Sequence, residues 1–210
     1  MPEKLKDEAY IDAPLPIGQE QTISQPCTVA FMMELLQIEP GDKVLDIGFG
    51  SGWTTALLAE IVSHSVIARI RQLAETKQSR ELTARSPRLS HIAGFTCDDK
   101  NRGKVFAIER IPELCEFGKK NVAKYFPDEE KVEMKCGDGI KGWPENAPFD
   151  KIIAGASGEK LPEAWKEQLK IGGRIVAPVK NSIWLFIKKD KNKFEEIEHP
   201  GFVFVPLIED

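Results

Sequence analysis

VLDIGFGSGW, residues 44–53, is the stretch that decides the fold. It opens with an apolar run and continues with Gly48, Gly50 and Gly52 at every second position. Such glycines let the backbone pass close to a ligand, and in an open α/β sheet they follow the first strand, at the carboxyl edge where ligands bind. We therefore expect a buried strand at residues 44–47, a ligand-binding turn, and then a helix at residues 54–62.

Short apolar runs and helical patterns alternate through the rest of the chain. Further buried strands are expected at residues 105–108, 132–134, 149–154 and 174–178, and further helices at residues 111–126 and 161–170. This alternation predicts an α/β fold, a mostly parallel twisted sheet with helices on both faces. The late segments SIWLFIKK (182–189) and GFVFVPL (201–207) predict antiparallel strands at the C-terminal edge.

Composition limits the classes of protein and partner. With 41% hydrophobic and 30% charged residues, the 210 residues suit one globular domain. No apolar run reaches the ~18 residues of a membrane span and no secretion signal is evident, so we expect a cytoplasmic protein without a membrane partner. The net charge of -4 argues against nucleic-acid binding. The scattered cysteines lack metal-ligand spacing and predict free thiols and no metal site: Cys27, Cys97, Cys115 and Cys136.

The spacing of the glycines after the first strand, in the segment called the glycine loop below, distinguishes two classes of cofactor-binding motif. A dinucleotide fingerprint, GxGxxG, would need glycine where Trp53 stands. The spacing present, DxGxGxG, resembles the first motif of class I S-adenosylmethionine-dependent methyltransferases. This resemblance implies a Rossmann-like class I methyltransferase fold and a loop that runs beside S-adenosyl-L-methionine, formed by Asp46, Gly48, Gly50 and Gly52. A tight turn without a ligand is the alternative.

An acidic residue at the end of the second strand should accept hydrogen bonds from the cofactor ribose, about 20 residues after the loop. Glu109 ends the strand KVFAIE but lies much later in the chain, and a solvated carboxylate is its alternative role. Removing residues 63–102, which lack a strand pattern, restores the interval, so we interpret them as an insertion with a helix in its early part, residues 66–84. Val62 and Gly103 should then lie close together, at the edge of the sheet opposite the cofactor.

The segment CGDG, residues 136–139, follows the third strand. Class I methyltransferases commonly use this position for adenine. The resemblance therefore implies that Asp138 accepts a hydrogen bond from the adenine amino group and that Gly139 leaves room for the ring. A plain Asp-Gly turn is the alternative.

The most specific resemblance lies in residues 10–36, YIDAPLPIGQEQTISQPCTVAFMMELL. Together with the glycine loop and five later segments, it resembles the protein-L-isoaspartate O-methyltransferase family over nearly the whole chain outside the insertion; these segments are AIERIPEL, GDG, APFDKIIAGAS, EQLKIGGRIVAPV and FVPLI. The resemblance implies methyl transfer to L-isoaspartyl carboxylates of damaged proteins, which begins repair through a succinimide. It also implies an active-site role for Ser24 and places Gln21, Thr22, Ile23 and Ser24 in the cofactor pocket.

The implied substrate carboxylate is ionised at neutral pH, because an unperturbed carboxyl has a pKa near 4. No strong general base is needed, so a site that excludes water and aligns the two reactants supplies most of the catalysis. Thr22 and Ser24 are small hydroxyl donors suited to orienting the carboxylate. Because Pro26 and an apolar helix follow Ser24, a helix cap is the alternative role of this serine, and both roles can coexist.

Three departures from the family pattern bear on substrate specificity. Glu20 stands where relatives usually have glycine, Cys27 replaces an aromatic residue or histidine, and a glycine-rich loop is shortened to residues 179–184. We expect one domain over residues 1–210, a monomer, in which residues 1–40 cap the cofactor and the substrate. The alternatives are a methyltransferase of the same fold acting on another carboxylate or a small molecule, and a non-catalytic binding module.

Overall fold

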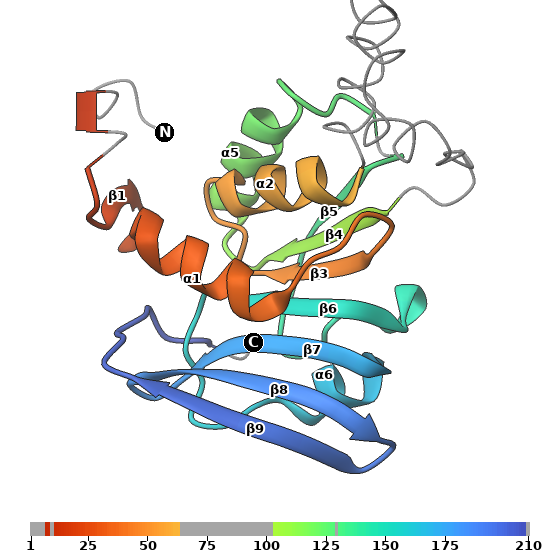
Figure 1. Ribbon diagram of the computed structural model, residues 1–210. Helices are drawn as coiled ribbons and strands as arrows, with labels where there is room; N and C mark the ends of the chain where they lie inside the picture. The colour runs from red at the N-terminus through yellow and green to blue at the C-terminus, as the bar shows by residue number, and fades with distance from the viewer. Residues whose placement is uncertain (1–6, 9–10, 64–102, 129, 209–210) are drawn as a thin grey trace, which may run out of the picture.

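A computed structural model of the protein describes residues 7–8, 11–63, 103–128 and 130–208 (Figure 1). In these residues one sheet has seven strands in the order β5-β4-β3-β6-β7-β8-β9. Strands β3 to β7 are parallel, and β8 and β9 are antiparallel at one edge. The predicted fold class, a mostly parallel sheet with antiparallel strands at one edge, is therefore confirmed. The strands are β3 (Lys43–Ile47), β4 (Lys104–Glu109), β5 (Val132–Cys136), β6 (Phe149–Ala154), β7 (Leu169–Val179), β8 (Ser182–Asp190) and β9 (Lys193–Pro200).

Helices cover both faces of the sheet (Figure 1). The first face is covered by α1 (Pro26–Leu36), α2 (Trp53–Val62) and α5 (Pro112–Val122). The second carries the shorter α6 (Glu163–Gln168) and the 3-10 turn η3 (Pro144–Asn146). Among the described residues, no helix has the length and apolarity needed to cross a membrane.

The core lies in two layers because alternate strand residues point to opposite faces of the sheet. On β3, Val44 packs with Leu58 of α2, whereas Leu45 packs with Trp165 of α6. All four side chains are almost fully buried. Burial on both faces explains why the parallel strands appear in the sequence as continuous apolar runs rather than alternating patterns.

The last strand differs from its sequence prediction. β9 occupies residues 193–200, whereas the predicted strand at 201–207 is wrong, since that segment forms only an isolated bridge between Pro206 and Ser157. β9 is an edge strand with mostly exposed polar residues, so its sequence lacks the apolar signal of a buried strand. The apolar residues Phe202 and Phe204 instead pack against the core layer that α1, α2 and α5 cover.

The ends of the predicted insertion meet in space, as expected. A Cβ atom placed on Gly103 would lie 2.7 Å from Cβ of Val62, so the two residues are in contact. Val62 O accepts a hydrogen bond from Gly41 N at 3.0 Å, and Asp42 O accepts one from Lys104 N at 3.1 Å. These contacts lie at the amino end of β4. The helix predicted within residues 66–84 lies outside the described residues.

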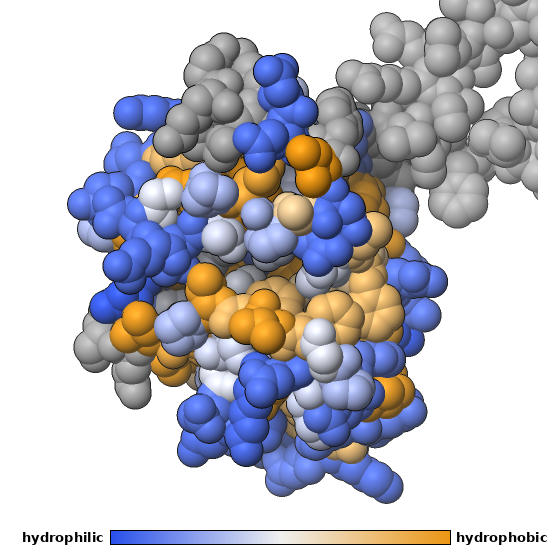
Figure 2. All heavy atoms as spheres, turned by 90° about the vertical axis from the view of Figure 1, so that its left-hand side faces the viewer, coloured by the Kyte–Doolittle hydropathy of each residue, from blue (hydrophilic) through white to orange (hydrophobic). Residues whose placement is uncertain are grey.

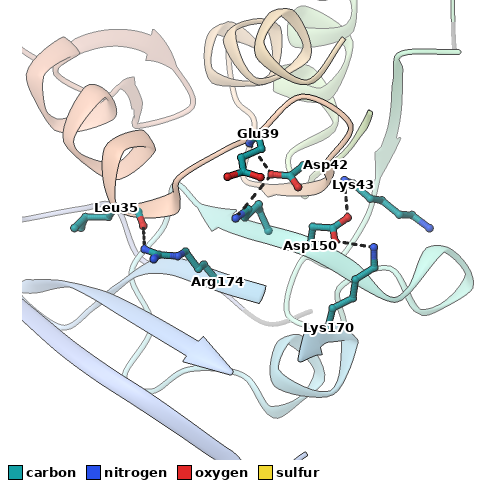
Figure 3. Close-up of polar contacts among 8 residues, drawn as sticks. Leu35, Glu39, Asp42, Lys43, Asp150, Lys170 and Arg174 are labelled. Carbon is teal, nitrogen blue, oxygen red and sulfur yellow. Dashed lines mark hydrogen bonds and ion pairs between the residues drawn. The ribbon is translucent and has the colours of Figure 1, made fainter. Parts of the chain in front are cut away.

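Polar contacts hold the amino edge of the sheet together (Figure 3). Oδ2 of Asp150 accepts a hydrogen bond from Lys43 N at 2.9 Å, and its Oδ1 accepts one from Lys170 Nζ at 2.7 Å. Arg174 Nη1 donates to Leu35 O at 2.8 Å and so fastens the end of α1 to β7. The carboxyl edge is the one left for a ligand.

One cysteine prediction is wrong. Cys115 on α5 and Cys136 at the end of β5 form a disulfide, with their Cα atoms 5.7 Å apart. The pair is separated by 21 positions on different elements, so only the fold brings the two cysteines together. Cys27 is a free, exposed thiol as predicted, and Cys97 lies outside the described residues.

Candidate active site

A pocket opens at the carboxyl edge of the parallel strands. Its walls come from the ends of β3, β4 and β6, the glycine loop, residues 204–208, and a hairpin formed by β1 (Leu15–Gly18) and β2 (Gln21–Ile23). Figure 2 shows the side of the molecule on which this edge lies, where apolar surface crosses the middle of the face between charged surroundings. β3 lies between β4 and β6, so the pocket is at the point where the strand order reverses, the usual ligand position in such sheets.

The pocket brings together most of the site residues predicted from the sequence: Gln21, Thr22, Ile23, Ser24, Asp46, Gly48, Gly50, Glu109 and Gly139. Gly52 and Asp138 do not line it. Gly52 precedes α2 with φ of 79°, and a Cβ there would lie 2.6 Å from Val122 Cγ2. Glycine at this position therefore allows α2 and α5 to pack closely.

Two pocket glycines are required by the backbone. Gly48 and Gly50 have φ angles of 78° and 49°, which side chains rarely tolerate. At Gly139, a Cβ atom would lie 2.6 Å from Cγ2 of Ile47. Glycine at position 139 therefore allows this loop to pack directly against the end of β3.

Glu109 is fixed at the wall of the pocket. It is only 6% exposed, and its Oε2 accepts a hydrogen bond from Gly50 N at 2.9 Å while its Oε1 accepts one from Ile111 N at 3.0 Å. The carboxylate thus ties the glycine loop to the end of β4. Each oxygen keeps acceptor capacity, so the pair can also receive two hydroxyl donors.

Asp138 provides a second acceptor next to the pocket. Its Oδ1 accepts a hydrogen bond from Ile140 N at 2.9 Å. Its Oδ2 is buried and has no hydrogen-bond partner among the described residues, although Lys141 Nζ lies 3.1 Å away. A buried carboxylate oxygen beside Gly139 that has an ion pair but no hydrogen bond can still accept one from an amino group such as that of adenine.

Asp46 lies under the glycine loop and is 2% exposed. Burial raises the pKa of its carboxyl to about 7, the charge of Glu109 acts in the same direction, and a 2.6 Å hydrogen bond from the Thr55 hydroxyl opposes them. A cation in the pocket would favour the ionised form of Asp46.

We expect Asp46→Asn to remove a pH-dependent loss of stability. The folded-state pKa of about 7 exceeds the ordinary 3.8, so the folded protein holds an extra proton between these values. The free energy of unfolding of the natural chain therefore falls as pH rises across that window, whereas an asparagine cannot ionise. Urea denaturation at mildly acidic and mildly alkaline pH should show the variant gaining relative to the natural chain at the higher pH. A difference that does not change with pH would contradict the burial argument.

The helix-cap interpretation of Ser24 is wrong. The N-cap of α1 is Gln25, without a side-chain cap hydrogen bond. Asp12 instead satisfies the helix end, since its Oδ1 accepts a hydrogen bond from Cys27 N at 2.9 Å, which lowers the pKa of Asp12. Within the described part of the chain, the hydroxyls of Thr22 and Ser24 make no hydrogen bond, and both residues line the pocket.

The hairpin that carries Thr22 and leads directly into Ser24 has a strained turn. Gly18 pairs with Gln21, so Gln19 and Glu20 are the two turn residues, and their φ angles are 53° and 57°. Two positive φ angles are typical of a type I′ turn, which favours glycine at its second position. This conformation gives a physical reason for the glycine that relatives usually have in place of Glu20.

Glu20→Gly should therefore raise the free energy of unfolding by about 0.5–1 kcal/mol, because glycine removes the steric cost of the left-handed conformation. Thermal or urea denaturation would measure the gain. Glu20→Ala is the matched control, since alanine keeps Cβ and should give no gain. Equal effects of the two substitutions would show that the turn is not the cause.

The sequence prediction missed part of the pocket. Residues 204–208 line it and are held by two hydrogen bonds, from Ser157 N to Val205 O and from Leu207 N to Ser157 O, both 2.8 Å. Arg110, Ile111 and Leu114 complete the wall beside Glu109. The segment FVPLI was visible as a family-like motif, but its apolar residues carry no chemical signal of a site.

Comparisons with known proteins indicate one family. The family model described as Protein-L-isoaspartate(D-aspartate) O-methyltransferase (PCMT) matches residues 1–99 and 91–210. The chain is 39% identical over 212 residues to the protein-L-isoaspartate O-methyltransferase of Methanopyrus kandleri, which covers 99% of this chain and 77% of that relative. It is 40% identical over 214 residues to the protein of the same name from Staphylothermus marinus, with 99% and 80% covered.

Solved structures are similar as well. A protein-L-isoaspartate O-methyltransferase matches with a TM-score of 0.71 and 27% identity over 95% of this chain, which spans 54% of that protein's length. A Plasmodium falciparum structure in complex with S-adenosyl-L-homocysteine has the same fold, with a TM-score of 0.73 at 22% identity over 98% of this chain and 84% of its own. The chain therefore belongs to the protein-L-isoaspartate(D-aspartate) O-methyltransferase family.

Proposed function

We propose that the protein transfers a methyl group from S-adenosyl-L-methionine to the carboxylate of L-isoaspartyl residues in damaged proteins and so begins their repair through a succinimide. The observation that carries this proposal is one pocket that joins an anchored Glu109 and the glycine loop to the free hydroxyls of Thr22 and Ser24. Family membership supports the same reaction.

The pocket has a suitable group for each part of the cofactor. Glu109 would bind the ribose hydroxyls, Asp138 would bind the adenine amino group, and Gly139, which lines the pocket, would leave room for the ring. The backbone at Gly48 and Gly50 would run beside the methionine part, with Asp46 below as a counter-charge for its cations. When bound, S-adenosyl-L-methionine supplies an electrophilic methyl group on a sulfonium.

The residues of the chain would act mainly by placement. Thr22 and Ser24 would donate hydrogen bonds to the substrate carboxylate and aim one of its oxygens at the methyl carbon. Apolar residues around the pocket, such as Ile17, Val29 and Leu207, exclude water, which favours a reaction in which an anion and a cation neutralise each other. The new O–CH3 bond forms as the S–CH3 bond breaks, and no proton is transferred.

We further propose that residues 1–210 act as one domain, with residues 1–40 capping the site and residues 63–102 inserted at the opposite edge. The β1-β2 hairpin in the pocket wall and the contact of Val62 with Gly103 support this division. The monomeric state and the cytoplasmic location remain predictions from the sequence.

A paired-peptide assay tests the function. Two peptides of one sequence, one with an L-isoaspartyl residue and one with a normal aspartyl residue, are incubated with the protein and labelled S-adenosyl-L-methionine. We expect label to enter only the isoaspartyl peptide. Transfer to neither peptide, with cofactor binding intact, would favour a methyltransferase with another substrate, whereas no cofactor binding would favour a non-catalytic module.

A further inference from the structure

The Cys115–Cys136 disulfide lies against the proposed cofactor pocket. Cys115 directly follows Leu114, which lines the pocket. The Cys115 side chain is fully buried in a small apolar cluster with Phe49 of the glycine loop and Ala107 of β4. Phe49 lines the pocket as well, so one end of the disulfide packs against a residue of the glycine loop that faces the pocket.

The other end of the disulfide lies beside residues 137–139, the loop proposed to bind adenine. Cys136 is the last residue of β5, pairs with Glu109 across the sheet, and lies two residues before Asp138. Gly137 N donates a hydrogen bond to Glu109 O at 2.9 Å. The disulfide therefore fastens the loop of residues 137–139 to α5, immediately beside the residue proposed to hold the ribose.

The two cysteines differ in exposure, as a redox-active pair requires. Cys136 is exposed, whereas Cys115 is buried. Lys119 Nζ lies 3.7 Å from Cys136 Sγ, and its ammonium favours the thiolate form of Cys136 after reduction. Glu116 moderates this effect, because its carboxylate lies near both sulfurs and 3.9 Å from Lys119 Nζ. An exposed cysteine next to a cation is the place where an external thiol or disulfide would react.

We propose that Cys115 and Cys136 form a redox-controlled site that sets the affinity for S-adenosyl-L-methionine. This inference rests on the proposed cofactor site. In the oxidised state the disulfide holds residues 137–139 in place for adenine. In the reduced state the loop loses its covalent link to α5, so cofactor binding must also order it, and the affinity falls.

The oxidant that forms the Cys115–Cys136 bond would be a small disulfide, such as oxidised glutathione, which reacts by thiol–disulfide exchange. The Cys136 thiolate attacks one sulfur of the small disulfide and expels one thiolate, and the Cys115 thiolate then attacks Cys136 Sγ and expels the second. The small disulfide gains two electrons and becomes two thiols, taking up the two protons that the cysteines release. Disulfides in a reducing compartment are usually transient, catalytic or redox-sensing, which suits this role if the protein is cytoplasmic.

Calorimetric titration with S-adenosyl-L-homocysteine tests the inference on the full chain. The natural chain is titrated after oxidation with oxidised glutathione and after reduction with a phosphine, and mass spectrometry of alkylated protein verifies each state. We expect the oxidised form to bind about five- to thirtyfold more tightly, since fixing the backbone of one residue costs that much. Cys136→Ser should bind like the reduced protein under both treatments, whereas Cys27→Ser, which changes the free exposed thiol, should respond like the natural chain.

A steady-state measurement separates control of the cofactor from a general loss of stability. Reduction should raise KM for S-adenosyl-L-methionine and leave KM for the isoaspartyl peptide unchanged. Equal affinities in the two verified states, an equal rise of both KM values, or failure of the disulfide to form would overturn the inference. Binding in both states without methyl transfer would count against the proposed reaction alone, and absence of binding in both states would remove the proposed cofactor site and this inference with it.

Discussion

Glu109→Ala should weaken binding of S-adenosyl-L-methionine by about 10- to 150-fold, which corresponds to roughly 1.5–3 kcal/mol for two charge-assisted hydrogen bonds to the ribose. The carboxylate is held in place by the backbone amides of Gly50 and Ile111, so it is preorganised for this contact. Its removal also leaves the Gly50 amide without its acceptor, which adds to the loss. Calorimetry with S-adenosyl-L-homocysteine measures the change directly.

Two controls make this result specific to the ribose. Glu113→Ala removes an exposed carboxylate from the first turn of α5, outside the pocket, and should leave the dissociation constant unchanged. A cofactor analogue without the ribose 2′-hydroxyl should bind the natural chain more weakly than S-adenosyl-L-homocysteine does, whereas Glu109→Ala should barely distinguish the two. An unchanged dissociation constant in Glu109→Ala would remove Glu109 from the site.

Ser24→Ala should lower kcat by about 10- to 100-fold, because losing one donor to the substrate carboxylate misplaces the attacking oxygen. The free energy of unfolding should change by less than about 0.5 kcal/mol, since Ser24 does not cap α1. The dissociation constant for S-adenosyl-L-homocysteine should change little. Turnover of the isoaspartyl peptide, urea denaturation and calorimetry measure these three quantities.

Thr28→Ala is the matched control for Ser24, because it removes a hydroxyl from α1 outside the pocket. We expect this variant to keep its turnover. If Ser24→Ala turned over the peptide as fast as the natural chain, per folded molecule, its hydroxyl would have no part in orienting the substrate.

The sequence was sufficient for strands β3 to β8 of the sheet and for one side of the site. Residues 44–53 combine a buried strand with glycines that only a close backbone approach requires, and each later strand is flanked by helical patterns. Glu109 was identified because the end of the second strand has a fixed place relative to the glycine loop in this topology. This step depended on the interpretation of residues 63–102 as an insertion, which is still a prediction.

What the sequence could not predict depends on contacts between distant segments. Asp12 caps α1 from outside the helix. The sequence pattern favoured Ser24 as the cap because Ser24 lies nearer to the helix, and it gave no sign of the role of Asp12. Cys115 and Cys136 meet only because α5 packs beside the edge strand β5. β9 was missed because a solvated edge strand needs no apolar pattern, and the apolar segment after it was mistaken for a strand.

The central claim is most directly tested by following one isoaspartyl peptide through repair by liquid chromatography and mass spectrometry. With the protein and S-adenosyl-L-methionine, we predict a methyl ester, then a succinimide that has lost methanol, and then a rising fraction of the peptide with a normal aspartyl residue. Without S-adenosyl-L-methionine the peptide should remain isoaspartyl. A peptide that stays isoaspartyl in the presence of the cofactor, or a methyl group found on any atom other than that carboxylate, would contradict the proposed function.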